Sequence, residues 1–413
     1  MSKIAVIGFG VVGSGTVELF EKNRESICEK VGRDCSLGYI LDIRDFPDSP
    51  YADKLTKDFE QILNDDEVEV VAEVVGGNTF AYDYTKRLLE KGKSVVTSNK
   101  ELVATHGAEL INIARQHNCN YLFEASVGGG IPILRPISKC LAGNEIIKIN
   151  GILNGTTNFI LTKMFKEQMD FETALKIAQD LGYAEHDPTA DIEGYDACRK
   201  VCILASLAYG KQVYPEQVHC SGISKITLDD MEYAENAGYA IKLIGSVKRV
   251  SDDKIAAMVC PRLVPKSNLI ASVEDNYNAI TVNCDGAGDV MFYGQGAGKL
   301  PTASAVVGDI IDCLKHKDRL LPIDWDDCDD KDYVIPYKKN ETAMYIRIKA
   351  ENADELKPSI SEIFGKLMYI ERAGREDNEL AFITPTMVEE EINADLELLA
   401  RNCEIASKIR LLG

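Results

Sequence analysis

The first third of the chain alternates short apolar runs with stretches of helical periodicity. The apolar runs are Lys3–Phe9, Ser36–Ile43, Val68–Gly76, Ser94–Ser98 and Asn120–Val127. The helical stretches lie near Val12–Val31, Phe59–Leu63, Phe80–Glu90 and Glu101–His117. Strands that alternate with helices are typical of a parallel sheet covered on both faces. The pattern therefore predicts an α/β domain of the doubly wound, Rossmann type.

The pattern changes after Gly128–Gly130. Helices are predicted at Pro132–Leu141, Asn158–Glu167, Phe171–Leu181, Asp196–Tyr209 and Ala303–Lys315. They are mixed with strand-like runs at Ile146–Leu153, Ile255–Val259, Ile280–Val282 and Val290–Tyr293. Strands grouped without regular helical crossovers favour an α+β domain.

An acidic, weakly patterned run at residues 324–332 predicts a linker. The elements predicted beyond it are Tyr345–Lys349, Asp354–Leu367, Met368–Arg372, Leu380–Ile383, Val388–Cys403 and Ile405–Leu411. They run strand, helix, strand, strand, helix, strand. This βαββαβ order is the ferredoxin-like plan of a small ligand-binding module.

Composition narrows the functional class. The chain has 413 residues and a formal net charge of -20, and so acidic a surface disfavours binding to nucleic acid or to anionic membranes. No apolar run reaches the roughly 18–20 residues that span a bilayer, and no signal-peptide pattern precedes the first strand. The 12 cysteines form no C-x-x-C pair, which disfavours structural zinc. We therefore expect a cytoplasmic protein with reduced thiols.

A G-x-G-x-x-G motif follows the first predicted strand and opens a helix. It comprises Gly8, Gly10 and Gly13, with Val11 and Val12 between the last two glycines. Gly8 permits a tight turn, Gly10 leaves no Cβ between backbone and pyrophosphate, and Gly13 allows close helix–strand packing. The free N–H groups of the helix N-terminus then face the phosphates. In this context the motif predicts a dinucleotide site.

The end of the second strand bears on the choice of dinucleotide. An acidic residue here binds the ribose 2′-hydroxyl of NAD, whereas an arginine favours the 2′-phosphate of NADP. Asp42 and Arg44 lie two positions apart. Arg44 lies further into the loop, which favours NADP, while Asp42 argues for NAD. A third interpretation is that both side chains are solvated charges of the loop.

The third and fourth strands end in short polar segments. Gly76 and Gly77 close the third strand, and Ser98 and Lys100 close the fourth. In a doubly wound sheet these carboxyl ends face the ligand crevice. Lys100 is therefore expected where nicotinamide and substrate meet.

An acidic loop precedes the helix predicted at Asp196–Tyr209. Five carboxylates occur within residues 185–196, and Asp196 is a plausible N-cap. Lys200 is four residues beyond Asp196, so the two share a helix face. A lysine beside carboxylates has a tunable pKa and can take a proton from an alcohol or give one to a carbonyl. The alternative is an ordinary ion pair beside a solvated loop.

The chain resembles homoserine dehydrogenases along residues 1 to about 320. The motifs that carry the resemblance are residues 8–13, 73–77, 98–100, 124–132, 154–158, 196–200 with the acidic loop, 296–298 and 301–304. The resemblance implies NAD(P)-dependent interconversion of L-homoserine and L-aspartate 4-semialdehyde, in threonine, methionine and isoleucine biosynthesis.

The resemblance also implies roles for individual residues. Lys200 is the acid–base residue, Asp196 holds and tunes it, and Lys100 lies on the other side of the substrate. The implied substrate-binding residues are Glu185 for the ammonium group, Asp191, Gly155 and Thr156. Gly298 is expected beside the cofactor. A monovalent cation, Na⁺ or K⁺, is expected near Glu124, held mostly by the backbone carbonyls of Val127, Gly129 and Ile131.

The family resemblance sets the expected domain boundaries. Residues 1–131 and about 299–320 would form the nucleotide-binding domain, and 132–298 the catalytic domain that pairs subunits into a homodimer or homotetramer. A linker at 321–341 would lead to an ACT-like domain at 342–413, a module that senses threonine in related enzymes. The expected turn after its first strand lacks the usual glycine and reads Glu351–Asp354. A module that binds no ligand is therefore the alternative.

Two other functions fit parts of the pattern. Residues 154–158 resemble a loop of phosphorylating semialdehyde dehydrogenases, but those enzymes need a nucleophilic cysteine. The nearest cysteine on the N-terminal side is Cys140. A dinucleotide-sensing regulator is the non-enzyme alternative, and it would need neither Lys100 nor Lys200.

Overall fold

The computed structural model describes residues 2–317, 319–328 and 330–413. Contacts divide the chain into two units. Unit 1 contains the described residues of Met1–Ile146, Cys202–Pro215 and Cys284–Asp329. Unit 2 contains those of Ile147–Val201, Glu216–Asn283 and Asp330–Gly413. Within the described ranges, no helix has both the length and the apolar character needed to cross a membrane.

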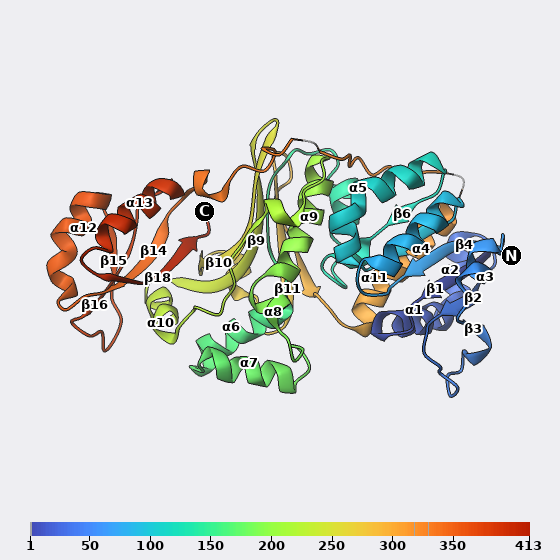
Figure 1. Cartoon of the computed structure of the whole chain (residues 1–413), viewed down its shortest axis with the longest axis horizontal. Coiled ribbons are helices and arrows are strands. Elements are labelled where there is room, and N and C mark those ends of the chain that lie inside the picture. The colour runs from blue at the N-terminus through green and yellow to red at the C-terminus, as the bar shows by residue number, and fades with distance from the viewer. Residues whose placement is uncertain (1, 318, 329) are drawn as a thin grey trace. The chain divides into compact units, whose positions relative to one another are not determined.

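A parallel sheet forms the centre of unit 1 (Figure 1). Among the described residues its strands are β1 (Ser2–Ile7), β2 (Cys35–Leu41), β3 (Leu55–Thr56), β4 (Val68–Glu73), β5 (Ser94–Thr97) and β6 (Tyr121–Leu122). They lie in the order β3-β2-β1-β4-β5-β6, and every neighbouring pair is parallel. This order confirms the predicted parallel α/β fold. The order reverses between β1 and β4, where doubly wound sheets bind their ligands.

The helices of unit 1 mostly match their predicted positions. They are α1 (Val11–Lys22), α2 (Arg24–Val31), α3 (Phe59–Asn64), α4 (Thr79–Glu90), α5 (Lys100–Gln116) and α11 (Lys299–Lys315). The single helix predicted over Val12–Val31 is wrong, because Asn23 leaves the helical conformation and separates α1 from α2. Val17, Phe20 and Ile310 are fully buried in the core that α1 and α11 share with the sheet. Each such side chain stabilises the fold by about 1.5–3 kcal/mol.

One tryptophan in the acidic run predicted as a linker is buried in the core of unit 1. Trp325 is 1% exposed, and its indole N–H donates to the Gln212 side-chain oxygen at 2.9 Å. Its ring meets Phe123 edge to face, with centroids 5.5 Å apart, and Gly107 leaves room for it. A single aromatic residue has no periodicity, so the sequence pattern did not reveal this contact.

Unit 2 is built on a mixed sheet. The strands in the order of pairing are β11 (Tyr277–Cys284), β7 (Ile146–Ile152), β9 (Tyr239–Ser251), β10 (Lys254–Pro265), β18 (Glu404–Leu411), β14 (Met344–Lys349), β16 (Glu379–Ile383) and β15 (Met368–Ile370). β8 (His219–Cys220) pairs with β10. The long strand β9 was not predicted, because lysine and glycine interrupt its apolar residues.

Seven helices of unit 2 lie within the described residues. They are α6 (Gly155–Glu167), α7 (Phe171–Asp180), α8 (Thr189–Ile192), α9 (Tyr195–Tyr209), α10 (Leu228–Asn236), α12 (Lys357–Phe364) and α13 (Glu389–Leu399). From Cys202 onward, α9 belongs to unit 1. The helix predicted at Pro132–Leu141 begins at Leu134 and is π-helical over Pro136–Cys140.

The C-terminal segment has the predicted βαββαβ order, β14-α12-β15-β16-α13-β18. Its four strands are antiparallel neighbours in the order β18-β14-β16-β15. β18 also pairs in parallel with β10, so this segment continues the sheet of the preceding part of unit 2. Arg347 on β14 reinforces the junction, with ion pairs to Asp230 on α10 and to Glu379 at 2.9 and 3.0 Å.

Candidate active site

The turn between β1 and α1 carries the glycine motif. Gly8 has a φ of +97°, and a Cβ on Gly13 would overlap the carbonyl oxygen of Gly8. This close turn therefore requires glycine at both positions. Gly10 is the N-cap of α1, and Val11 and Val12 begin the helix. The first N–H groups of a helix lack intrahelical partners and suit a bound anion, so the turn fits the pyrophosphate of a dinucleotide.

Asp42 and Arg44 form an ion pair just beyond β2. The Asp42 carboxylate accepts the Phe9 N–H at 2.7 Å, the Arg44 backbone N–H at 2.9 Å, and the Arg44 guanidinium at 2.9 and 3.0 Å. The Arg44 guanidinium holds the pKa of the Asp42 carboxyl well below its ordinary value. The side chain of Asp42 is 6% exposed and that of Arg44 is 58% exposed. A ligand approaching this loop therefore meets Arg44 first.

The other predicted cofactor residues of unit 1 lie at element ends. Gly76 and Gly77 follow β4 and are exposed. Ser98 follows β5, and Lys100, which is partly buried, is the first residue of α5. Gly298 is the N-cap of α11, with a φ of +125° that favours glycine. Because β4 and β5 are parallel neighbours, their carboxyl ends bring Gly76, Gly77, Ser98 and Lys100 to the same edge of the sheet.

Two residues that were not predicted to be site residues hold this edge together. Asn99 caps α5 and donates to the carbonyl oxygens of Val75 and Gly77, 3.1 and 2.7 Å away. Glu73, which is fully buried, accepts the Val75 N–H and the Thr97 hydroxyl, each at 2.8 Å. Burial raises the pKa of Glu73 to about 7. The two side chains therefore fix the glycine turn after β4 to the start of α5.

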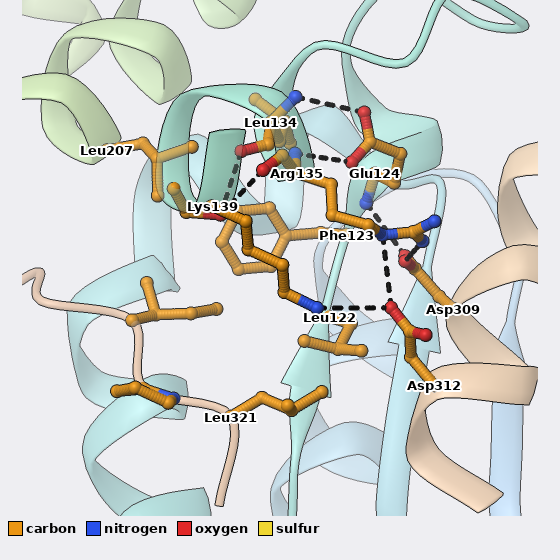
Figure 2. A pocket seen from close by; sticks show the side chains of 13 residues that line it. Leu122, Phe123, Glu124, Leu134, Arg135, Lys139, Leu207, Asp309, Asp312 and Leu321 are labelled. Atoms are coloured by element: carbon orange, nitrogen blue, oxygen red, sulfur yellow. Dashed lines mark hydrogen bonds and ion pairs between the residues drawn. The ribbon is translucent and has the colours of Figure 1, made fainter. Parts of the chain in front are cut away.

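Glu124, predicted beside a monovalent cation, borders a small pocket in unit 1 (Figure 2). Its carboxylate accepts the backbone N–H groups of Ile133, Leu134 and Arg135 at 2.6, 2.9 and 2.7 Å. Its own N–H donates to Asp309, whose pKa burial raises to about 7. Across the described residues, no group of three or more His, Cys, Asp or Glu side chains is arranged to hold a metal ion. Any cation here would depend on backbone carbonyls.

The predicted lysine and its carboxylates meet in unit 2. The Lys200 ammonium donates to Asp196 Oδ2 and to the Leu153 carbonyl oxygen, each at 2.7 Å. The side chains of Lys200 and Asp196 are only 10% and 7% exposed. The Asn154 side-chain N–H₂ donates to the same Asp196 oxygen at 2.9 Å and to Asp191 at 2.6 Å. One amide therefore connects both carboxylates to the lysine.

Helix α6 begins beside this cluster. Asn154 is its N-cap and accepts the Thr157 N–H at 2.8 Å. A Cβ on Gly155 would come within 2.6 Å of the Asn276 carbonyl oxygen, so a close backbone approach requires glycine. The Thr156 hydroxyl donates to the Tyr183 carbonyl oxygen at 2.7 Å. That hydroxyl is thus bonded to the segment just before the acidic loop, and the backbone of Gly155 and Thr156 remains as the polar surface of this turn.

Two predictions about the acidic loop are changed by the structure. Asp196 is not the N-cap, because α9 already begins at Tyr195 and the Asp196 side chain turns to Lys200 and Asn154. Glu185 lies exposed on the loop between α7 and α8. Within the described residues its carboxylate makes no hydrogen bond or ion pair, so it is not hydrogen-bonded to the cluster around Lys200.

Comparison with known proteins agrees with this geometry. Residues 132–311 match the family described as homoserine dehydrogenase, and residues 8–124 match the homoserine dehydrogenase NAD-binding domain. The homoserine dehydrogenase of Pseudomonas aeruginosa is 36% identical over 406 residues, covering 95% of this chain and 93% of that protein. The chain belongs to the homoserine dehydrogenase family.

Other relatives agree with this assignment. The homoserine dehydrogenase of Bacillus subtilis is 42% identical over 318 residues, which cover 76% of this chain and 73% of that protein. The crystal structure of a homoserine dehydrogenase from Thiobacillus denitrificans superposes with a TM-score of 0.89 at 33% identity, over 100% of this chain and 98% of that one. The protein is accordingly an NAD(P)-dependent oxidoreductase that interconverts L-homoserine and L-aspartate 4-semialdehyde.

Proposed function

We propose that Lys200 is the acid–base group of the homoserine dehydrogenase reaction. The observation that carries the proposal is its burial with Asp196 and Asn154 in a hydrogen-bonded cluster that also includes Asp191. In the reducing direction the Lys200 ammonium gives a proton to the aldehyde oxygen. In the oxidising direction its amine takes the hydroxyl proton of homoserine. A nicotinamide cofactor, when bound, would supply or accept the hydride.

Asp196 and Asn154 act on Lys200 by position and charge. Asp196 stabilises the ammonium form, because an opposite charge in hydrogen-bond contact favours the charged state. Asn154 donates to the oxygen that Lys200 contacts, which fixes the orientation of the carboxylate. A rigid acceptor of this kind keeps the lysine in one rotamer. Lys100, the first residue of α5 in unit 1, is the proposed second lysine of the reaction.

The substrate's amino-acid group is assigned to residues around the start of α6. Asp191, already beside Asn154, and Glu185, exposed on the acidic loop, would bind the ammonium group. The backbone N–H groups of Gly155 and Thr156 open α6 and suit the substrate carboxylate. Glu185 would contact the ligand from the loop between α7 and α8, and loops of this kind commonly close over a bound ligand.

We assign the dinucleotide to the edge formed by Gly8–Gly13, Gly76–Gly77, Ser98 and Gly298, with NADP favoured over NAD. Arg44 supports this preference, since it is exposed, and Asp42 has its oxygens occupied. In the alternative, Arg44 moves aside and Asp42 binds the ribose hydroxyls of NAD. A Na⁺ or K⁺ ion would be held by carbonyls of Val127, Gly129 and Ile131 beside Glu124.

The C-terminal segment is proposed as an ACT-like module, and the whole chain as a homodimer or homotetramer. Its βαββαβ order supports the first assignment. In such modules a glycine in the turn after the first strand lets the backbone approach an amino-acid ligand. Here that turn contains the buried Ala353 and also Asp354, which forms an ion pair with Arg375 at 2.7 Å. A threonine effector would therefore have to bind elsewhere on the module.

The test is dinucleotide reduction by the purified protein, followed through the near-ultraviolet absorbance of the reduced nicotinamide. L-homoserine with NAD or NADP should give turnover that depends on homoserine. Folded protein that binds dinucleotide and turns over neither pair would contradict the assigned reaction. L-serine, one methylene shorter, is the matched control substrate and should react far more slowly.

A further inference from the structure

A second pocket lies in unit 2, and Glu193 of the acidic loop is among the residues that line it. Its volume is about 820 Å³, within the range of small-molecule sites. α13 and β18 of the C-terminal segment form one wall, and residues 219–226 form another. Tyr337 and His219 stack face to face in it, with ring centroids 3.7 Å apart. None of the residues proposed for catalysis lines it.

Basic side chains gather in this pocket. They are Lys225, Lys338, Lys408 and Arg410. Arg410 is neutralised by the buried Glu389, through hydrogen bonds at 2.5 and 2.8 Å. Within the described residues the other three have no carboxylate partner; Lys408 donates only to the Asn393 amide oxygen at 3.1 Å. In a chain with a net charge of -20, such a group of unpaired cations is uncommon.

These ammonium groups disfavour one another. Burial, and then the positive charge of Arg410, lower the pKa of Lys408, and Lys338 and Lys225 add to the effect. The carboxylates of Glu193 and Glu397 also line the pocket, but among the described residues neither forms an ion pair with these lysines; Glu193 accepts the Ser224 hydroxyl at 3.0 Å. A ligand carrying two or more negative charges would relieve the repulsion and accept charge-assisted hydrogen bonds.

We propose that this pocket binds a small polyanion, bearing phosphate or carboxylate groups, and that the ligand acts on the catalytic cluster. A zwitterionic amino acid fits less well, because its ammonium group would add a cation to an already cationic pocket. The Ser407 hydroxyl and the Asn393 side-chain N–H₂ are further donors in the lining.

The pocket wall is joined to the acidic loop by short contacts. The Ile223 N–H donates to the Ile192 carbonyl oxygen at 2.9 Å. A Cβ on Gly222 would collide with that same carbonyl. Ile192 and Glu193 directly follow Asp191, which Asn154 holds in the lysine cluster. A ligand that displaces residues 221–225 therefore shifts Asp191, and this coupling rests on the function proposed for the cluster.

The test is calorimetric titration of the full-length protein with inorganic phosphate and with citrate, without substrate or cofactor. Potassium chloride at matched ionic strength is the control for screening. We expect saturable binding of at least one polyanion, weakened roughly tenfold to a hundredfold in Lys338→Gln and Lys408→Gln, since each removes a charge-assisted contact. Lys366→Gln removes an exposed charge of the same segment outside the pocket and should bind as the wild type does.

Several results would overturn the proposal. The proposal fails if neither polyanion binds saturably, if all variants bind equally, or if chloride reproduces the effect. It also fails if L-threonine alone binds, with the same dependence on Lys338 and Lys408. A change of oligomeric state in the lysine variants, without loss of anion binding, would make the pocket a subunit interface instead. The Michaelis constant for homoserine, measured with and without the anion, tests the coupling. Turnover without anion tests the proposed reaction separately.

Discussion

The buried pair of Lys200 and Asp196 gives the sharpest test of the mechanism. Lys200→Met keeps the length of the side chain and removes its charge. Loss of a general acid–base group should lower turnover by roughly 10²–10⁴-fold, or about 3–5 kcal/mol of activation free energy. The same change leaves the carboxylate of Asp196, 7% exposed, without its cation. Breaking a buried ion pair in this way costs about 3–5 kcal/mol of stability.

The double variant Lys200→Met/Asp196→Asn separates the two effects. It removes the stranded charge, so most of the lost free energy of unfolding should return, while turnover should stay low because no proton donor replaces the lysine. Urea unfolding gives the stability, and single-turnover reduction of aspartate semialdehyde gives the chemical step. Lys176→Met is the control, since its pair with Asp180 is exposed, at 67% and 63%, and should change neither quantity measurably.

A double variant with recovered stability and near-normal turnover would refute the reasoning. Lys200 would then be a structural lysine that only neutralises Asp196. Low stability in both variants would leave the turnover measurement decisive, provided that it is made on the folded fraction. The wild-type pH profile adds a further check, because a lysine acid–base group should titrate in turnover and that limb should vanish in the double variant.

Three further predictions follow from single side chains. Arg44→Ala should raise the Michaelis constant for NADP by about tenfold or more and change that for NAD little, in steady-state assays with both; equal effects would remove Arg44 from phosphate recognition. Glu185→Gln should raise the Michaelis constant for homoserine and leave turnover nearly unchanged; an unchanged constant would exclude it from the ammonium site. Glu73 has a native pKa of about 7, raised above its ordinary value, so the native state binds more protons between about pH 4.5 and 7 and is destabilised as pH rises through that window. Glu73→Gln should remove up to about 3 kcal/mol of this dependence in urea titrations at several pH values, and a parallel pH dependence in both proteins would contradict the assignment.

The sequence predicted best what depends on neighbours along the chain. The turn at Gly8–Gly13 and the pair of Asp196 and Lys200 are both local, since a motif of six residues and a spacing of four suffice to specify them. Strand alternation likewise predicted the parallel sheet. The break at Asn23 was missed because apolar periodicity continues across it.

The missed site residues depend on contacts far apart in sequence. Asn154 could be suspected as an N-cap, since Gly-Thr-Thr follows it, but its two acceptors lie 37 and 42 residues away. Asn99 bonds to carbonyls 22 and 24 residues away. Glu185 shows the converse, because its place in a motif predicted a role but not its exposed position.

Trp325 gives this protein an internal optical reporter. The chain contains one tryptophan, and it is buried in unit 1 against Phe123, with its indole N–H bonded to Gln212. Selectively excited fluorescence should therefore follow the melting of the nucleotide-binding unit alone, whereas far-ultraviolet circular dichroism sees the whole chain. Two transitions that coincide would mean that the units unfold together, and two that separate would show that each unit has a stability of its own.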